Sequence, residues 1–117
     1  MRVLVVDDER PCLDELVYLL SKQENVEIVG AFTSPLEALK ASLELNFDAA
    51  FLDLSMPHLN GAELARKMLS RGSCFKVVFV TAYAKELAKL RDNPAAGSVL
   101  KPVSEAKLQE LLRRLPG

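Results

Sequence analysis

Residues 2–9 read Arg-Val-Leu-Val-Val-Asp-Asp-Glu, an unbroken apolar run that ends abruptly in three acids. A second run, Ala49-Ala-Phe-Leu-Asp-Leu54, carries its acid, Asp53, near the same end. Continuous Val-, Leu- and Phe-rich runs without apolar–polar alternation are typical of strands in a parallel sheet that is covered on both faces. We therefore predict strands at residues 2–6 and 49–54, and similar runs predict further strands at 26–31, 75–80 and 98–100.

Amphipathic stretches separate these runs and predict helices. The first places leucine and valine at helical spacing, and the last begins at Ser104 and does the same before Pro116-Gly117 ends it. A third pattern follows Gly61, and a short, weakly amphipathic helix is expected at about 84–91. The apolar positions of the three clearer helices are Leu13, Leu16, Val17 and Leu20; Leu64, Ala65 and Met68; and Leu108, Leu111, Leu112 and Leu115.

The remaining helix has a start signal in Ser34-Pro35-Leu36-Glu37. Ser34 is expected to be the N-cap, Pro35 the first helical residue, and Glu37 the partner that closes a capping box. Leucines at 36, 39 and 43 then predict a buried stripe.

Five strand–helix units follow one another, which predicts an α/β fold. Such alternation favours a parallel sheet with right-handed crossovers and helices on both faces. Five units are too few for a closed eight-stranded barrel, so we expect a (βα)5 doubly wound five-stranded sheet, with residues 1–117 forming one domain.

The composition is that of an ordinary globular domain, with a net charge of −1. That balance gives no bulk attraction to nucleic acid or to an anionic membrane. It hides a split, because residues 1–58 carry four basic and eleven acidic residues, whereas 59–117 carry eleven and five. Cys12, Cys74 and the single His58 are too scattered for a thiolate zinc site, and we expect free thiols. No apolar run resembles a signal peptide or a membrane span, so we expect a cytoplasmic protein.

Acidic side chains stand at the carboxyl ends of two predicted strands, where ligand sites form in open α/β sheets. If the first and third strands are neighbours, about 4.8 Å apart, Asp7, Asp8 and Asp53 converge. Three carboxylates so close together repel one another, and a cation relieves that repulsion. The ligands offered are all oxygens, which favours Mg²⁺ over Mn²⁺ or Ca²⁺.

Two further polar residues follow the fourth and fifth predicted strands. Thr81 follows the fourth run and Lys101 the fifth. An acidic metal pocket with a lysine and a hydroxyl suits phosphoryl transfer, in which a carboxylate itself serves as nucleophile. Each residue alone has a plainer interpretation as a solvated loop acid, a turn residue or a Lys-Pro loop. Their joint occurrence at four strand ends is what favours a site.

Four segments stand at the ends of predicted strands. They are Val-Leu-Val-Val-Asp-Asp-Glu at 3–9, Phe-Leu-Asp-Leu-Ser-Met-Pro-His-Leu-Asn-Gly at 51–61, Val-Thr-Ala-Tyr at 80–83 and Leu-Lys-Pro-Val at 100–103. Together, in this order and at these spacings, they resemble the receiver domain of bacterial two-component response regulators, and the resemblance covers the whole chain. It implies the flavodoxin-like, CheY-like strand order 2-1-3-4-5.

The resemblance also implies roles for individual residues. Asp53 would accept a phosphoryl group, and Mg²⁺ would be held by Asp8, Asp53 and the backbone carbonyl of Ser55. Asp7 would complete the acidic pocket, partly through a metal-bound water. Lys101 and Thr81 would contact the phosphoryl oxygens, and Pro102 would follow a cis peptide bond.

The chain departs from the family pattern three residues before Lys101. Receivers usually carry Tyr or Phe there, and this chain has Ser98, so the relay of the Thr81 movement to the outer surface is in question. Tyr83 lies close enough in sequence to Thr81 to shield the phosphoryl group from water. The stretch 81–103 looks most like receivers joined to LytTR-type DNA-binding domains.

We therefore expect a phosphorylation-switched module. Its partners would be a sensor histidine kinase or histidine phosphotransfer protein, and an output domain or downstream protein. A homodimer would use the surface formed by residues 84–91, 98–100 and the helix after Ser104, and this domain would bind no nucleic acid or membrane.

Three other functions stay open. A binding module of the same fold could act without phosphorylation, with Ser98 as its support. A phosphatase of the haloacid dehalogenase type would need a second Asp two residues after Asp53, where Ser55 stands. Nucleotide binding at the first turn would need a glycine-rich motif that this turn does not have.

Overall fold

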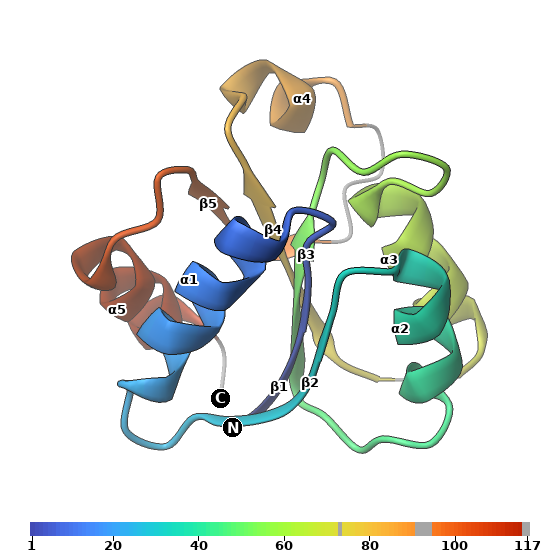
Figure 1. Ribbon diagram of the computed structural model, residues 1–117, viewed down its shortest axis with the longest axis horizontal. Helices are drawn as coiled ribbons and strands as arrows, with labels where there is room; N and C mark the ends of the chain where they lie inside the picture. Colours follow the sequence, from blue (N-terminus) through green and yellow to red (C-terminus); the bar gives the residue numbers. More distant parts are fainter. Residues whose placement is uncertain (73, 91–94, 116–117) are drawn as a thin grey trace.

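The computed structural model describes residues 1–72, 74–90 and 95–115, and within them strands and helices alternate along the chain (Figure 1). All strand pairs are parallel, and the sheet order is β2-β1-β3-β4-β5, as the resemblance implied. The elements are β1 (Arg2–Val6), α1 (Arg10–Ser21), β2 (Glu27–Phe32), α2 (Pro35–Ser42), β3 (Ala49–Asp53), α3 (Gly61–Ser70), β4 (Lys76–Thr81), α4 (Ala84–Ala88), β5 (Ala95–Leu100) and α5 (Glu105–Arg114).

Helices cover both faces of the sheet, which confirms the doubly wound architecture. Helices α1 and α5 lie on one face, and α2 and α3 lie on the other (Figure 1). Side chains alternate along β1, so Val3 and Val5 pack with Leu13 and Leu108, whereas Leu4 and Val6 pack beneath α2 and α3. Both faces of β1 and β3 are therefore buried, which explains why their sequences are continuously apolar.

Helix α2 buries a different face from the one that its leucines predict. Leu39 is buried, but Leu36 and Leu43 are 61% and 58% exposed. The buried face instead uses two small residues, Ala38 and Ser42, beside Leu39. The Ser42 hydroxyl donates to the Leu39 carbonyl at 2.6 Å, which satisfies its polar group inside the protein. The predicted leucine stripe is therefore wrong, because small residues form most of the buried face of α2.

The helix starts follow the expected chemistry with one difference. Ser34 caps α2 by accepting a hydrogen bond from the Glu37 N–H, and Pro35 begins the helix. Both halves of a capping box form instead at α3, between Asn60 and Glu63. The return bond from the Glu37 carboxylate is not among the contacts of the described residues.

The last strand is longer than the sequence predicted, and helix α4 is shorter. Strand β5 begins at Ala95, because its Ala-Ala-Gly start pairs with β4. This start is only weakly apolar, so the sequence did not predict it. Helix α4 ends at Ala88 and buries none of its residues, while the predicted end at residue 91 and the helix stop at 116–117 lie outside the described residues.

Cys12 and Cys74 are free thiols, as expected. Within the described ranges, no helix is long and apolar enough to cross a membrane.

Candidate functional site

Asp7, Asp8 and Asp53 meet at the carboxyl edge of the sheet because β1 and β3 are neighbours. Each offers a carboxylate oxygen, and these oxygens lie within 4.8 Å of one another. Asp7 is 1% exposed and Asp53 4% exposed, whereas Asp8 is half-buried. The convergence predicted from the two acidic strand ends is therefore present.

Backbone hydrogen bonds fix two of these carboxylates. The Glu9 N–H donates to Asp7 Oδ1 at 3.0 Å, and the Ser55 N–H donates to Asp53 Oδ1 at 3.2 Å. Each acid is thus held by the amide two residues further along its own loop. This geometry leaves the second oxygen of each carboxylate, Oδ2, facing the pocket lysine, Lys101.

The loop after Asp53 turns tightly into α3, and Gly61 permits that turn. A Cβ at position 61 would lie only 2.5 Å from the Asp53 carbonyl oxygen, so any side chain here would push the helix away. The Gly61 N–H donates to the Leu54 carbonyl at 3.1 Å, and Met56 and Leu59 are buried beneath the loop. His58, at the exposed tip, has a φ of 70°.

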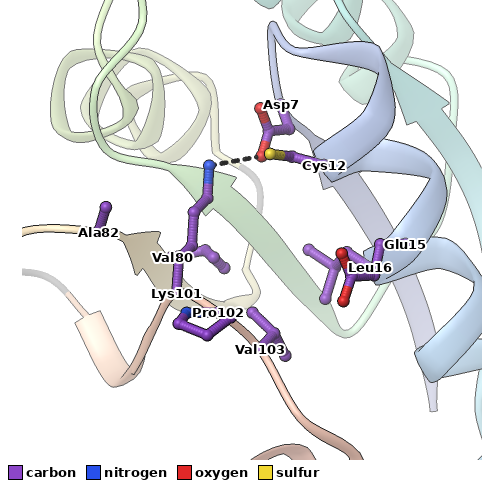
Figure 2. Close-up of a pocket in the computed structure, with 9 residues that line it drawn as sticks. All are labelled: Asp7, Cys12, Glu15, Leu16, Val80, Ala82, Lys101, Pro102 and Val103. Carbon is purple, nitrogen blue, oxygen red and sulfur yellow. Dashed lines mark ion pairs between the residues drawn. The ribbon is translucent and has the colours of Figure 1, made fainter.

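Lys101 enters the pocket from the end of β5. Its Nζ lies 3.0 Å from Asp7 Oδ2, the ion pair drawn in Figure 2, and 3.7 Å from Asp53 Oδ2. The Lys101 N–H donates to the Thr81 carbonyl at 2.7 Å, which continues the pairing of β4 with β5 beyond the strand. The Lys101–Pro102 peptide bond is cis, as the resemblance implied.

The pocket holds more negative than positive charge. Burial, together with the nearby Asp7 carboxylate, raises the pKa of Asp53 from 3.8 to about 7, although Lys101 and the Ser55 N–H oppose the rise. Burial disfavours the Lys101 ammonium, but its contacts with Asp7 and Asp53 raise the pKa of Lys101 above its ordinary value. Three carboxylates and one ammonium give a formal charge of −2, which a proton on Asp53 would halve and a divalent cation would neutralise.

The oxygens present fit a hard divalent cation. Among the described residues, Asp8 Oδ1 is buried and has no hydrogen-bond partner, whereas Asp7 Oδ2 is compensated by the Lys101 ammonium at 3.0 Å. Buried carboxylate oxygens without donors are costly unless a cation compensates them. The metal-ligating group found among the described residues consists of three carboxylates, a chemistry that favours Mg²⁺ over softer metals.

Thr81 and Tyr83 connect the pocket to α4. Thr81 is fully buried at the end of β4, and its Oγ1 accepts a hydrogen bond from the Tyr83 N–H at 3.1 Å. Tyr83 is the N-cap residue of α4, and it is 63% exposed. The Thr81 hydroxyl is therefore tied directly to the start of α4.

Ser98 and Pro102 are both exposed, but only Pro102 borders the cavity that Asp7 and Lys101 line. Ser98 lines a cavity of about 440 Å³ between α4 and α5, with Leu87 and Leu111 among its other walls. The structure thus brings Asp7, Asp8, Asp53 and Lys101 together, while Ser98 borders a separate hollow on the outer surface.

Sequence reasoning missed one neighbour of the pocket, Cys12. It lines a cavity of about 310 Å³ together with Asp7, Lys101 and Pro102, and Figure 2 shows its sulfur beside the Asp7 carboxylate. Burial raises the pKa of the Cys12 thiol. Its place on the first turn of α1, directly after the acidic loop, was the available signal.

Comparison with protein families matches residues 3–113 to the response regulator receiver domain. This chain belongs to that family. It is 39% identical over 115 residues to an uncharacterised response regulatory protein of Yersinia pestis, covering 98% of this chain and 48% of that protein. It is 36% identical over 115 residues to the transcriptional regulatory protein BtsR of Escherichia coli, with the same coverage. The receiver chain thus spans about half the length of these relatives.

Solved structures agree with this assignment. The response regulatory domain of MrkE from Klebsiella pneumoniae matches with a TM-score of 0.86 and 32% identity, over 98% of this chain and 94% of that one. The chemotaxis protein CheY4 of Vibrio cholerae matches with a TM-score of 0.85 over 98% of both chains, at 21% identity, and shows the shared fold. The receiver is thus a CheY-like module of two-component signalling.

Proposed function

We propose that Asp53 of this receiver accepts a phosphoryl group from a phosphohistidine on a partner protein. The main support is the position of Asp53, which is buried in one pocket with Asp7 and Asp8. Its Oδ2 lies 3.7 Å from the Lys101 ammonium. A carboxylate nucleophile, a cation site and a nearby ammonium are the parts that phosphoryl transfer needs, because its catalysis consists mainly of positioning and charge stabilisation.

Mg²⁺ is the proposed cofactor of this step. Asp8, Asp53 and the Ser55 backbone carbonyl would hold it, and Asp7 would contribute partly through a bound water. When bound, the cation supplies positive charge that neutralises the carboxylates and the incoming phosphoryl oxygens. Within the described residues, the buried Asp8 Oδ1 has no hydrogen-bond partner, and this supports the assignment.

In the transfer itself, a carboxylate oxygen of Asp53 forms the new bond to phosphorus. The N–P bond of the phosphohistidine breaks, and the departing imidazole keeps that electron pair and takes up a proton. The product is an acyl phosphate on Asp53. Lys101, now paired with Asp7, would turn its ammonium toward the phosphoryl oxygens.

Thr81 would transmit the conformational change from the pocket to α4. Its hydroxyl would donate to the phosphoryl group, which changes the contact that Oγ1 makes with the Tyr83 N–H at the start of α4. A shift of α4 would alter the surface formed by α4, β5 and α5. Because Ser98 replaces the usual aromatic, we propose that Tyr83 and the α4 start carry this coupling.

The partners follow from the chemistry and from the relatives. A sensor histidine kinase or a histidine phosphotransfer protein would supply the phosphoryl group, in the cytoplasm. The transcriptional regulatory name of relatives such as BtsR supports an output domain that controls transcription. We treat residues 1–117 as a single receiver domain. Attachment to a LytTR-type domain and a homodimer through α4, β5 and α5 stay predictions.

Intact-mass analysis tests the proposal. The receiver is incubated with acetyl phosphate and Mg²⁺, and a gain of one labile phosphoryl group is expected. Asp53→Asn should abolish the gain, whereas Asp14→Asn, on the exposed surface of α1, should leave it unchanged. No adduct on the wild-type chain with any divalent cation would contradict the proposal. It would favour a binding module that acts without phosphorylation.

A further inference from the structure

We propose that Lys107 is a positioning residue that holds Lys101 in the acidic pocket. This inference rests on the proposed function and adds a residue to it. Lys107 lies in the first turn of α5, and its Nζ donates to two backbone carbonyls, those of Leu100 at 3.3 Å and Pro102 at 3.1 Å. These two carbonyls immediately flank Lys101. The ammonium of Lys107 therefore bridges the two ends of the segment that carries the pocket lysine.

The segment needs such a bridge because few other backbone contacts are available to it. Strand β5 is an edge strand and ends at Leu100, and Pro102 has no N–H to donate. The Lys101 N–H to the Thr81 carbonyl, at 2.7 Å, ties the segment to β4 on one side. Lys107 ties it to α5, so that the segment is restrained from two elements.

Lys107 is itself held in place by the cap of its helix. Ser104 is the N-cap of α5, and its hydroxyl accepts from the Lys107 N–H at 3.2 Å. A cation in the first turn of a helix opposes the helix dipole. The two carbonyl acceptors compensate for that opposition, and they give Lys107 a local reason to occupy this position.

The consequence concerns the reach of Lys101. Its Nζ lies 3.0 Å from Asp7 and 3.7 Å from Asp53, so a small displacement of the backbone would remove it from both carboxylates. Reaction rates respond strongly to misplacement of a charged group by an ångström or less. Lys107, although exposed and outside the pocket, thus sets the geometry with which Lys101 meets the phosphoryl group.

Three variants test the positioning role. Lys107→Met removes the ammonium and keeps the helix-forming stem, Lys107→Arg keeps a long cationic donor, and Lys67→Met removes an equal charge from the exposed face of α3. The direct readout is hydrogen exchange of the Lys101 amide, measured by NMR. We expect faster exchange in Lys107→Met, by about tenfold, and exchange close to wild type in the other two variants. Unchanged exchange in Lys107→Met would overturn the proposal.

The second readout is the initial rate of phosphorylation by acetyl phosphate. We expect Lys107→Met to be slower by roughly threefold to tenfold, with Lys107→Arg restoring the rate. A slower rate without faster Lys101 exchange would mean a charge effect and would overturn positioning. If the wild-type receiver takes no phosphate, the proposed function fails. The exchange measurement still decides whether Lys107 restrains the segment.

Discussion

The ammonium of Lys101 lies closer to Asp7, at 3.0 Å from Oδ2, than to the proposed acceptor Asp53, at 3.7 Å. The ion pair with Asp7 holds the Lys101 ammonium inside the pocket, but it leaves the Asp53 carboxylate without an equally close positive charge. An arriving phosphoryl group would compete with Asp7 for the same ammonium. The relation of these residues predicts that Lys101 serves the response to phosphorylation more than the stability of the fold.

Lys101→Ala should therefore leave the receiver folded and break its conformational response. The Lys101 side chain is 19% exposed and is not part of the hydrophobic core, so the packing of the core does not depend on it. NMR chemical shifts of α4 should change on phosphorylation of the wild-type chain and stay close to the unphosphorylated values in the variant. Identical α4 changes in both phosphorylated proteins would show that Lys101 has no part in the switch.

Asp53→Asn should stabilise the metal-free protein near neutral pH. The pKa of Asp53 rises from 3.8 to about 7 on folding, so the unfolded chain loses this proton at a lower pH than the folded protein does. The free energy of unfolding therefore falls as the pH rises from 3.8 to about 7. An amide cannot ionise, so the variant avoids this cost. We expect it to be more stable by roughly 1–4 kcal/mol in chelator. Urea unfolding measures this, and the difference should shrink as the pH approaches the ordinary pKa of an aspartate.

The affinity for Mg²⁺ should rise with pH through the neutral range. A cation binds the ionised form of Asp53, and the raised pKa, about 7 in the metal-free pocket, means that a proton competes for the site at mildly acid pH. Below this pKa each pH unit should weaken binding by up to about tenfold. Titration calorimetry at several pH values measures the trend. An affinity independent of pH would show that Asp53 does not contribute to the cation site.

Gly61→Ala should destabilise the receiver by about 1–3 kcal/mol, because its Cβ would lie 2.5 Å from the Asp53 carbonyl, a backbone atom that cannot rotate away. Gly97→Ala is the matched control. Its Cβ would also approach an atom at 2.5 Å, but that atom is the terminal Leu111 Cδ1, which a rotamer change moves. Thermal unfolding should rank Gly61→Ala as the less stable of the two. The reverse order would contradict the role assigned to the loop.

Much of the fold follows from the strand sequences. Apolar runs that stop at Asp7 and Asp53 indicate buried parallel strands whose acids share one edge of the sheet. The strand order, in contrast, came from the family resemblance, because periodicity does not say which strands are neighbours. Helix α2 was misread since its buried face uses Ala38 and Ser42, whose small size gives no hydrophobic signal. Strand β5 was predicted short because pairing with β4, and not its own composition, orders Ala95–Gly97.

The site divides in the same way. Residues at strand ends were predictable, because chain position and fold class together place them at one edge. Contacts made by long side chains from other elements were not. Nothing in the sequence indicated that Lys107 reaches back to the carbonyls of Leu100 and Pro102, or that Cys12 lies beside Asp7. Such contacts depend on how α1 and α5 sit against the sheet, and local patterns carry no information on that packing.

The proposed function depends above all on Asp53 carrying the phosphoryl group as an acyl phosphate. Borohydride reduces an acyl phosphate to the corresponding alcohol, so treatment of the acetyl phosphate-loaded receiver followed by peptide mapping locates the modified carboxylate. We expect homoserine at position 53 when acetyl phosphate and Mg²⁺ are both present, and unmodified Asp7 and Asp8. Reduction at another carboxylate, or none at all in a chain shown to carry phosphate, would contradict it.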